Sequence, residues 1–255
     1  MFHVVIPARH GSVRFPGKPL APLLGRPMLQ WVHERASASR AASVTIATDD
    51  ARIAAAAQGF GAAVRMTRAD HASGTDRIAE VAALERWDDA AIVVNVQGDE
   101  PGIPPAVIDQ VAQLLGVHAD ADIATLATPV TGLEQFLDPN AVKVVADLEG
   151  RALYFSRAPI PWSRDGAAAG LASQQRWQGA RRHLGIYAYR VGALRRLAQL
   201  PPAALEETEK LEQLRALANG LRIRVADAIE VPGPDVNTPE DLERAAQRLA
   251  ATATR

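Results

Sequence analysis

The chain has 255 residues, 48% of them hydrophobic, and its formal net charge is −1 at pH 7. This length and apolar content allow one large domain with a substantial core, and the near-neutral charge excludes a general attraction to nucleic acid or to an anionic membrane. Cysteine is absent, which excludes disulfides, thiolate catalysis and zinc–thiolate sites. Because neither a signal-peptide pattern nor an apolar run of membrane-spanning length is present, we expect a soluble, cytoplasmic protein without membrane or nucleic-acid partners.

The first strand and the loop after it carry the strongest local pattern. An apolar run from Val4 to Ile6 that stops at Pro7 predicts a buried strand. The next residues combine two glycines with three cations and no acidic residue: Arg9, Gly11, Arg14, Gly17 and Lys18. Glycines let backbone N–H groups approach an anion, so this loop is predicted to bind phosphate, with a solvated basic loop as the alternative. Its spacing does not match a Walker A loop, and no G-x-G-x-x-G motif follows the strand.

Helix and strand signals then alternate along the chain. They predict helices over 27–39, 49–59, 74–87 and 104–115, and strands over 44–48, 63–66, 92–96 and 123–127. Strands that are separated by helices form parallel sheets, which helices cover on both faces. The predicted fold class is therefore α/β, with a mostly parallel, Rossmann-like sheet.

The pattern changes after residue 130. Strands predicted over 142–145, 152–155 and 184–189 follow one another without ordinary helices between them, which indicates a smaller antiparallel extension over about 130–190, a candidate dimerisation element. Residues 163–181, rich in Ala, Gly and Gln, predict a mobile loop. Helices over 191–200 and 208–219, a strand over 221–225 and a closing helix capped by Thr238 complete a single domain that spans 1–255.

A second informative segment is NVQGDEP, residues 95–101, which places Asp99 just beyond the predicted central strand. In open α/β sheets, ligands bind beyond the carboxyl ends of the strands, and a carboxylate there can hold Mg²⁺ against phosphate oxygens. The alternative is that Asp99 and Glu100 are turn residues before Pro101. Asp76 and Asp235, considered singly, are better explained as residues near helix ends.

Several segments in this order resemble one family, the 3-deoxy-D-manno-octulosonate cytidylyltransferases or CMP-KDO synthetases, in which KDO is an eight-carbon acid sugar. The segments are PAR with RFPGKP (7–19), RADHASGTDR (68–77), NVQGDEP (95–101), NAVKV (140–144), YFSR (154–157), IPW (160–162), RHLGIY (182–187), LEQLR (211–215) and TPEDL (238–242). The resemblance covers nearly the whole chain and is weakest over 163–181. The number and order of the segments make it specific.

The resemblance implies a nucleotidyltransferase that joins CTP and KDO into CMP-KDO, releases pyrophosphate and supplies lipopolysaccharide biosynthesis. It also implies a Rossmann-like nucleotidyltransferase fold, dependence on Mg²⁺ and a cytoplasmic homodimer. The physics of the reaction agrees, because negative charge builds on the α-phosphate and on the leaving pyrophosphate, where fixed cations and a metal are effective.

The resemblance also implies roles for individual residues. The catalytic residues would be Lys18, Arg14 and Asp99. The nucleotide-binding residues would be Ala8, Arg9, Gly11, Ser12, Arg14, Lys18, Arg68, Ser73, Gly74 and Thr75. The sugar-binding residues would be Gln97, Arg157, His183, Tyr187, Glu212 and Gln213. The metal ligands would be Asp99 and Asn237, and at the second of these positions the family has aspartate.

Two other functions stay open from the sequence. The chain could be a cytidylyltransferase for another acid sugar, such as a sialic acid or a KDO variant, although the matches beyond residue 140 favour KDO. It could also be a nucleotide-binding protein that has lost catalysis. The joint presence of Arg14, Lys18 and Asp99 argues against a pure binder, which has no need of a metal carboxylate aimed at a triphosphate. His183 could equally be a neutral core histidine that is hydrogen-bonded to backbone.

Overall fold

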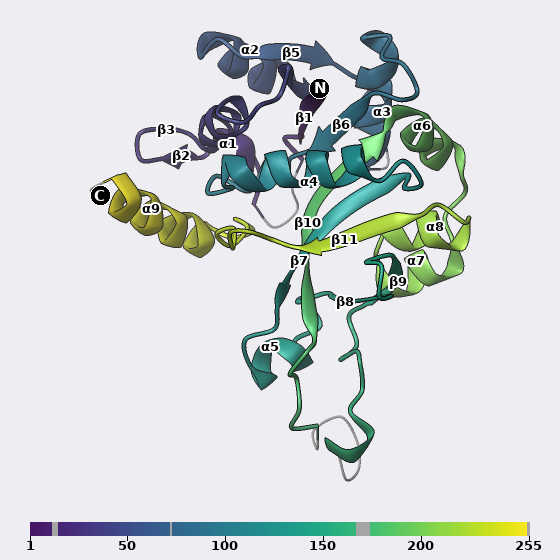
Figure 1. Ribbon diagram of the computed structural model, residues 1–255. Helices are drawn as coiled ribbons and strands as arrows, with labels where there is room; N and C mark the ends of the chain where they lie inside the picture. The colour runs from purple at the N-terminus through teal and green to yellow at the C-terminus, as the bar shows by residue number, and fades with distance from the viewer. Residues whose placement is uncertain (12–14, 72, 167–173, 254–255) are drawn as a thin grey trace.

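The computed structural model describes residues 1–11, 15–71, 73–166 and 174–253 (Figure 1). The predicted site residues Ser12 and Arg14, and positions 167–173 of the predicted loop, lie outside these ranges. Within them, no helix is both long enough and apolar enough to cross a lipid bilayer.

A central sheet organises the described part of the chain. Its strands lie in the order β11, β7, β10, β6, β1, β4, β5. Their bounds are β1 Phe2–Ala8, β4 Ser43–Thr48, β5 Ala63–Met66, β6 Ile92–Asn95, β7 Ile123–Pro129, β10 Arg181–Arg190 and β11 Ile223–Asp227. The pairs β1–β4, β1–β6, β4–β5 and β7–β11 are all parallel. The predicted mostly parallel α/β sheet is therefore confirmed.

Helices cover both faces of this sheet. Helices α1 (Met28–Ser37), α2 (Ala51–Gly59) and α4 (Pro105–Val117) pack on the face that includes Val4 and Ile6. Helices α3 (Gly74–Leu84), α6 (Val191–Gln199) and α8 (Gln213–Ala218) pack on the face that includes Val5. The alternation follows from the two-residue period of a strand, which sends successive side chains to opposite faces.

One strand departs from the predicted pattern. β10 lies between β6 and β7 and is antiparallel to both, with Tyr187 opposite Asn95 of β6 and Thr125 of β7. The sequence placed residues 184–189 in a peripheral extension, whereas this strand is central to the sheet. The reason is that its C-terminal half is buried on both faces, so the apolar pattern marks a central strand without showing its direction.

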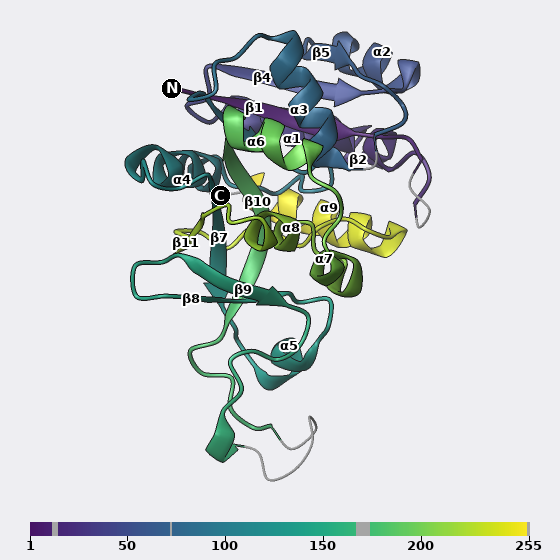
Figure 2. The ribbon, with the colours of Figure 1, turned by 90° about the vertical axis from the view of Figure 1, so that its right-hand side faces the viewer.

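The extension itself is built on the other half of β10. Arg181 and Arg182 pair with β8 (Lys143–Ala146), and β8 pairs with β9 (Ala152–Ser156), both antiparallel. Figures 1 and 2 show β8, β9 and the short helix α5 (Leu133–Leu137) projecting from one edge of the main body. The antiparallel extension predicted over about 130–190 is thus present, and β10 joins it to the central sheet.

The predicted helix over 208–219 is two helices. α7 spans Ala204–Glu209 and α8 begins at Gln213, because Lys210 takes up a left-handed conformation with φ of 53°. A left-handed residue ends an α-helix, and no sequence signal such as Gly marks this break. The structure also contains short elements that the sequence did not predict, namely α5, the 3-10 turns η1 (Lys18–Leu20) and η2 (Arg164–Gly166), and the paired strands β2 (Pro22–Leu23) and β3 (Arg26–Pro27).

The last helix closes the site region. α9 (Pro239–Ala253) starts where predicted, and the hydroxyl oxygen of Thr238 accepts a hydrogen bond from the Asp241 backbone N–H at 3.2 Å. Its apolar residues Ala245 and Leu249 pack against Leu23 and Met28. Val236, in the segment before this helix, belongs to the same cluster.

Candidate active site

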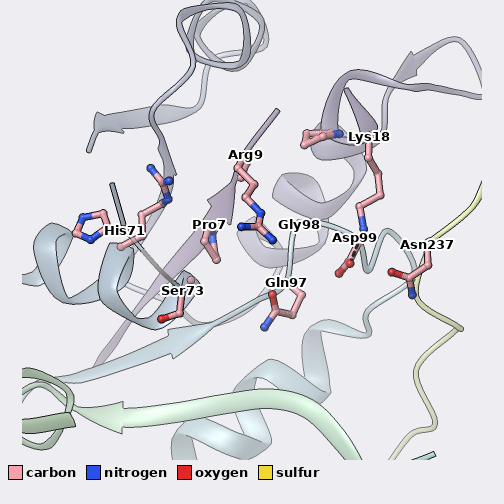
Figure 3. A pocket seen from close by; sticks show the side chains of 13 residues that line it. Pro7, Arg9, Lys18, His71, Ser73, Gln97, Gly98, Asp99 and Asn237 are labelled. Atoms are coloured by element: carbon pink, nitrogen blue, oxygen red, sulfur yellow. Dashed lines mark hydrogen bonds and ion pairs between the residues drawn. The ribbon is translucent and has the colours of Figure 1, made fainter. Parts of the chain in front are cut away.

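A cavity of about 400 Å³ opens at the carboxyl ends of β1 and β6 (Figure 3). Its lining comes from the first loop, the start of α3, the segment after β6 and the segment before α9. The lining residues are Pro7, Ala8, Arg9, Lys18, Pro19, His71, Ser73, Gly74, Arg77, Gln97, Gly98, Asp99 and Asn237. The position is the one where open α/β sheets bind ligands, and it is where the sequence placed the phosphate loop and Asp99.

The floor of the cavity depends on a close backbone approach. A Cβ atom at Gly98 would lie 3.0 Å from the Pro7 carbonyl oxygen, which is tighter than ordinary packing allows. Glycine therefore lets the loop after β6 approach the end of β1. This contact brings the two predicted site segments into one cavity.

An ion pair joins these segments directly. Lys18 Nζ donates to Asp99 Oδ2 at 2.7 Å and to the Val236 carbonyl oxygen at 2.9 Å. The Val236 N–H donates to the Asp99 carbonyl oxygen at 2.9 Å. The sequence found no acidic residue to neutralise the cations of the first loop, and the fold supplies one from 81 positions further along the chain. Figure 3 shows Lys18, Asp99 and Asn237 together at one end of the cavity.

The other end of the cavity is the N-terminus of α3. Ser73 caps the helix, with Ser73 Oγ accepting from the Asp76 N–H at 3.2 Å and the Ser73 N–H donating to Asp76 Oδ2 at 3.1 Å. Asp76 is thus the second half of a capping box. This result agrees with the interpretation of Asp76 as a helix-end residue, and it places Ser73 and Gly74, at the start of the helix, in the lining of the cavity.

The guanidinium group at this end is not the one the sequence selected. Arg68 is 68% exposed by side chain, pairs with Asp70 at 3.0 Å and does not line the cavity. Arg77 does line it, is buried, donates to the Thr67 hydroxyl and lies 3.3 Å from Asp49. The RADHASGTDR motif contains both arginines, and only the helical position of Arg77 on α3 turns its side chain inward.

A second cavity of about 160 Å³ adjoins the first through Gly74 and Gln97. It gathers four of the residues that the resemblance assigned to the sugar, together with Thr75 of the nucleotide set: Thr75, Gln97, Tyr187, Glu212 and Gln213. Glu212 accepts hydrogen bonds from Ser73 Oγ and Thr75 Oγ1, each at 2.9 Å. Burial nevertheless raises the pKa of Glu212 above its usual value.

The sequence did not single out Asn95, which also lines this second cavity. It is buried, and its Oδ1 has no hydrogen-bond partner among the described residues. A buried carbonyl oxygen without a partner costs free energy unless a ligand or water satisfies it. The sequence feature that could have identified Asn95 is its position at the end of the predicted central strand, two residues before Gln97.

Arg157 and His183 lie apart from these sugar-side residues. Arg157 donates from Nε to the Glu209 carbonyl oxygen at 2.6 Å and from Nη1 to the Pro139 carbonyl oxygen at 2.9 Å, and it lines neither cavity. The His183 ring contacts Thr125 Oγ1 at 2.9 Å, and its burial lowers its pKa to about 3. His183 is therefore neutral, as in the alternative of a core histidine.

His183 lines a third cavity, of about 190 Å³. Glu100, Arg182 and Asp235 share it. Asp235 is exposed as a residue, but protein atoms crowd its carboxyl group, and this loss of water, followed by the charge of Asp99, raises its pKa to about 6. Burial, and then the negative charges of Asp235 and Asp99, raise the pKa of Glu100 well above its usual value.

The chemistry of these oxygen donors suits Mg²⁺. Asp99 and Asn237 present carboxylate and amide oxygens, and the cationic Nζ of Lys18 already lies against Asp99 and a backbone carbonyl. The described residues contain no group of three or more His, Cys, Asp or Glu side chains that could hold a metal by themselves. A Mg²⁺ ion at this place would therefore need phosphate oxygens or water as further ligands, as is usual for this ion.

Comparison with known proteins identifies a family whose model covers most of the residues that line the cavity. The family model described as cytidylyltransferase matches residues 3–223, which include the first two cavities almost entirely. The chain therefore belongs to the cytidylyltransferase family.

Within this family, the chain is similar to curated proteins named 3-deoxy-manno-octulosonate cytidylyltransferase. That of Pseudomonas syringae pv. syringae is 58% identical over 248 residues, covering 97% of this chain and 98% of the relative. That of Thioalkalivibrio sulfidiphilus is 55% identical over 250 residues, covering 98% and 99%.

Solved structures give the same result. The structure of a CMP:2-keto-3-deoxy-manno-octonic acid synthetase complexed with CTP superposes with a TM-score of 0.88 at 41% identity and covers 98% of both chains. A cytidylyltransferase from Leptospira borgpetersenii, at 17% identity and a TM-score of 0.63, shares the fold.

Proposed function

We propose that the protein transfers CMP from CTP to the anomeric hydroxyl of KDO and releases pyrophosphate. The observation that carries the proposal is the cavity that joins the phosphate loop, Asp99 and the N-terminus of α3 in a chain with full-length relatives of this name. The complex of the similar synthetase with CTP supports CTP as the nucleotide. KDO as the acceptor is supported by the names of the relatives.

Different residues of the first cavity would contact different parts of CTP. Lys18 and Arg9 provide positive charge near the carboxyl end of β1, where the triphosphate would lie. Fixed cations stabilise the charge that develops on the α-phosphate oxygens and on pyrophosphate as the bond between the α- and β-phosphates breaks. Ser73, Gly74 and Arg77 would hold the cytosine end.

The second cavity would hold the sugar, and Gln97 would lie between nucleotide and sugar because it lines both cavities. The carboxylate of Glu212 can accept hydrogen bonds from sugar hydroxyls while Ser73 and Thr75 fix its position. Such a fixed acceptor orients a hydroxyl-rich substrate without further reorganisation.

Mg²⁺ is part of the proposal. Asp99 would be its protein ligand and Asn237 a neutral oxygen ligand. When bound, the ion would neutralise phosphate charge and stabilise the leaving pyrophosphate. A cytoplasmic location and a homodimeric state also stay predictions.

The test is pyrophosphate release with each of CTP, UTP, ATP and GTP against KDO and a sialic acid, with and without Mg²⁺. We expect release only when CTP, KDO and Mg²⁺ are all present. Equal rates with UTP would contradict the nucleotide assignment, and a higher rate with the sialic acid would favour the other acid-sugar reaction. Binding of CTP without any turnover would indicate the catalytically silent protein.

The variant Asp99→Asn sharpens this test. It removes the negative charge that lies next to Lys18 and that would bind the proposed Mg²⁺. One well-placed electrostatic group is typically worth about 3–4 kcal/mol of transition-state stabilisation. We therefore expect kcat to fall by about 100-fold or more. A variant with full activity would show that Asp99 is a turn residue, as the sequence alone allowed.

A further inference from the structure

Asn95 is the last residue of β6 and lies in the middle of the central sheet. It is opposite Val5 of β1 on one side and Tyr187 of β10 on the other. Because strand side chains alternate between faces, Asn95 points to the same face as Val93, which belongs to the core cluster that includes residues of α3, α6 and α8. Asn95 is 3% exposed. A polar side chain is thus placed inside a mainly apolar layer.

The side-chain oxygen of Asn95 is an unused hydrogen-bond acceptor. Its Oδ1 is buried and has no partner among the described residues. Buried amide oxygens nearly always have a partner, because burial without one costs the hydration that the group has in water. Asn95 lines the second cavity together with Thr75, Gln97, Tyr187 and Glu212. A ligand in this cavity is therefore in position to supply the missing donor.

Other polar groups in this cavity also accept rather than donate. Ser73 Oγ and Thr75 Oγ1 each donate a hydrogen bond to Glu212, at 2.9 Å. A hydroxyl has one hydrogen to give, whereas each carboxylate oxygen of Glu212 keeps a further lone pair. A ligand that fits these groups must bring hydrogen-bond donors. A compound with several hydroxyls does so, and one whose polar atoms are ether or ketone oxygens does not.

We infer that Asn95 is a specificity-determining residue for the acceptor sugar, and that its Oδ1 accepts a hydrogen bond from a sugar hydroxyl in the second cavity. Gln97, two residues further along the chain, lines both cavities, so Asn95 lies near the place where sugar and nucleotide would meet. The inference rests on the proposed function, because that function supplies the sugar. The competing role for Asn95 is structural, as a residue that only shapes the end of β6.

The test replaces Asn95 by leucine, which has nearly the same shape and no acceptor. Loss of the hydrogen bond to the sugar should raise the KM for KDO by about tenfold and leave the KM for CTP within about twofold of the parent. Asn95→Leu also removes an oxygen that is unpaired without the sugar, so the melting temperature of the protein without substrates should stay the same or rise. A structural role requires the reverse, a lower melting temperature without a selective change in the KM for KDO.

Thr125→Val is the matched control, because Thr125 of β7 lies opposite Tyr187 on the other side of β10 from Asn95. The Thr125 hydroxyl is buried and already bonded, since it donates to the Ile186 carbonyl oxygen at 2.7 Å and contacts His183 Nε2 at 2.9 Å. This variant should lower the melting temperature and leave the KM for KDO unchanged.

A second variant, Asn95→Ala, removes the same oxygen without adding bulk. It should raise the KM for KDO as Asn95→Leu does, and it keeps the test decisive if the leucine variant does not fold. The inference is overturned if neither variant changes the KM for KDO, if only the leucine variant raises it, or if both KM values rise together as the melting temperature falls. Turnover by the parent with unchanged variants would remove only the role of Asn95, whereas parent protein without turnover would overturn the proposed function and this inference with it.

Discussion

The imidazole of His183 is held neutral by its position in the fold. It lies between the rings of Phe155 and Tyr187, with centroids at 5.0 and 5.2 Å, and the nearby positive charge of Arg182 adds to the effect of burial in lowering its pKa. Thr125 Oγ1, at 2.7 Å from the Ile186 carbonyl oxygen, donates there and so can accept from His183 Nε2. This residue lines the third cavity and contributes to stability in a pH-dependent way.

The pH dependence of stability has a definite sign. The pKa of His183 is about 3 in the folded protein and about 6.5 in the unfolded chain, so only the unfolded chain takes up this proton as the pH falls. Stability from His183 is therefore complete above pH 6.5 and is lost progressively below it.

Between pH 7.5 and pH 5, we expect the free energy of unfolding of the parent to fall by about 2 kcal/mol more than that of His183→Gln. Urea denaturation of both proteins at a series of pH values measures this difference. Parallel pH profiles for the two proteins would mean that His183 titrates normally in the folded state.

At the scale of the elements, the break between α7 and α8 places Glu212. In a continuous helix over 208–219, the direction of the Glu212 side chain would follow from the helical period. Instead, the left-handed conformation of Lys210 ends α7 and changes the direction of the chain before α8 begins. Arg157 holds this break, since it binds the carbonyls of Glu209 and Pro139 by its side chain and its N–H donates to Glu209 Oε2 at 2.9 Å. Strand β9 is thereby tied to the helix pair.

This arrangement determines what we expect of Arg157→Lys. Lysine cannot reach several carbonyls with a planar fork, so the variant should lose about 1–3 kcal/mol of stability and should raise the KM for KDO only through Glu212. Thermal melting and steady-state kinetics with both substrates measure these effects, with the exposed Arg164→Lys as the control. A large rise in the KM for KDO at an unchanged melting temperature would instead identify Arg157 as a direct sugar ligand.

At the scale of the whole molecule, the extension presents apolar side chains to solvent. Leu148 and Leu153, in and beside the β8–β9 pair, are 107% and 62% exposed, and Trp162 is 42% exposed. Figures 1 and 2 show this part projecting from the main body. Exposed apolar side chains also occur elsewhere on the protein, so it is the projecting position of this extension (Figure 1) that makes it the candidate interface between subunits.

We therefore expect a homodimer in sedimentation equilibrium, with the extension at its interface. Leu153→Glu would place a charge in that interface and should shift the protein toward monomer by about tenfold or more in Kd. Leu84→Glu, a comparable change at the end of α3 on the main body, is the control and should leave the dimer intact. A parent protein that sediments as a monomer at micromolar concentration would contradict the predicted dimer.

Local sequence determined most elements of the main sheet, because their signals are short-range. The first strand, the Asp50 cap of α2 and the strand 63–66 each depend on neighbours in the chain, and all three are present. The predicted stop at Pro7 is wrong, because β1 continues through Pro7 to Ala8, where it still pairs with β4. The motifs around Lys18, Ser73 and Asp99 indicated the site, since residues at the carboxyl ends of parallel strands converge by the topology of the fold.

Only the tertiary structure decided how distant residues meet. It paired Lys18 with Asp99, turned Arg77 rather than Arg68 into the cavity, and made β10 a central antiparallel strand. None of these outcomes has a local signal. Ion pairing, side-chain direction and strand pairing depend on which segments the core brings together, and that choice minimises the free energy of the whole chain rather than of any one segment.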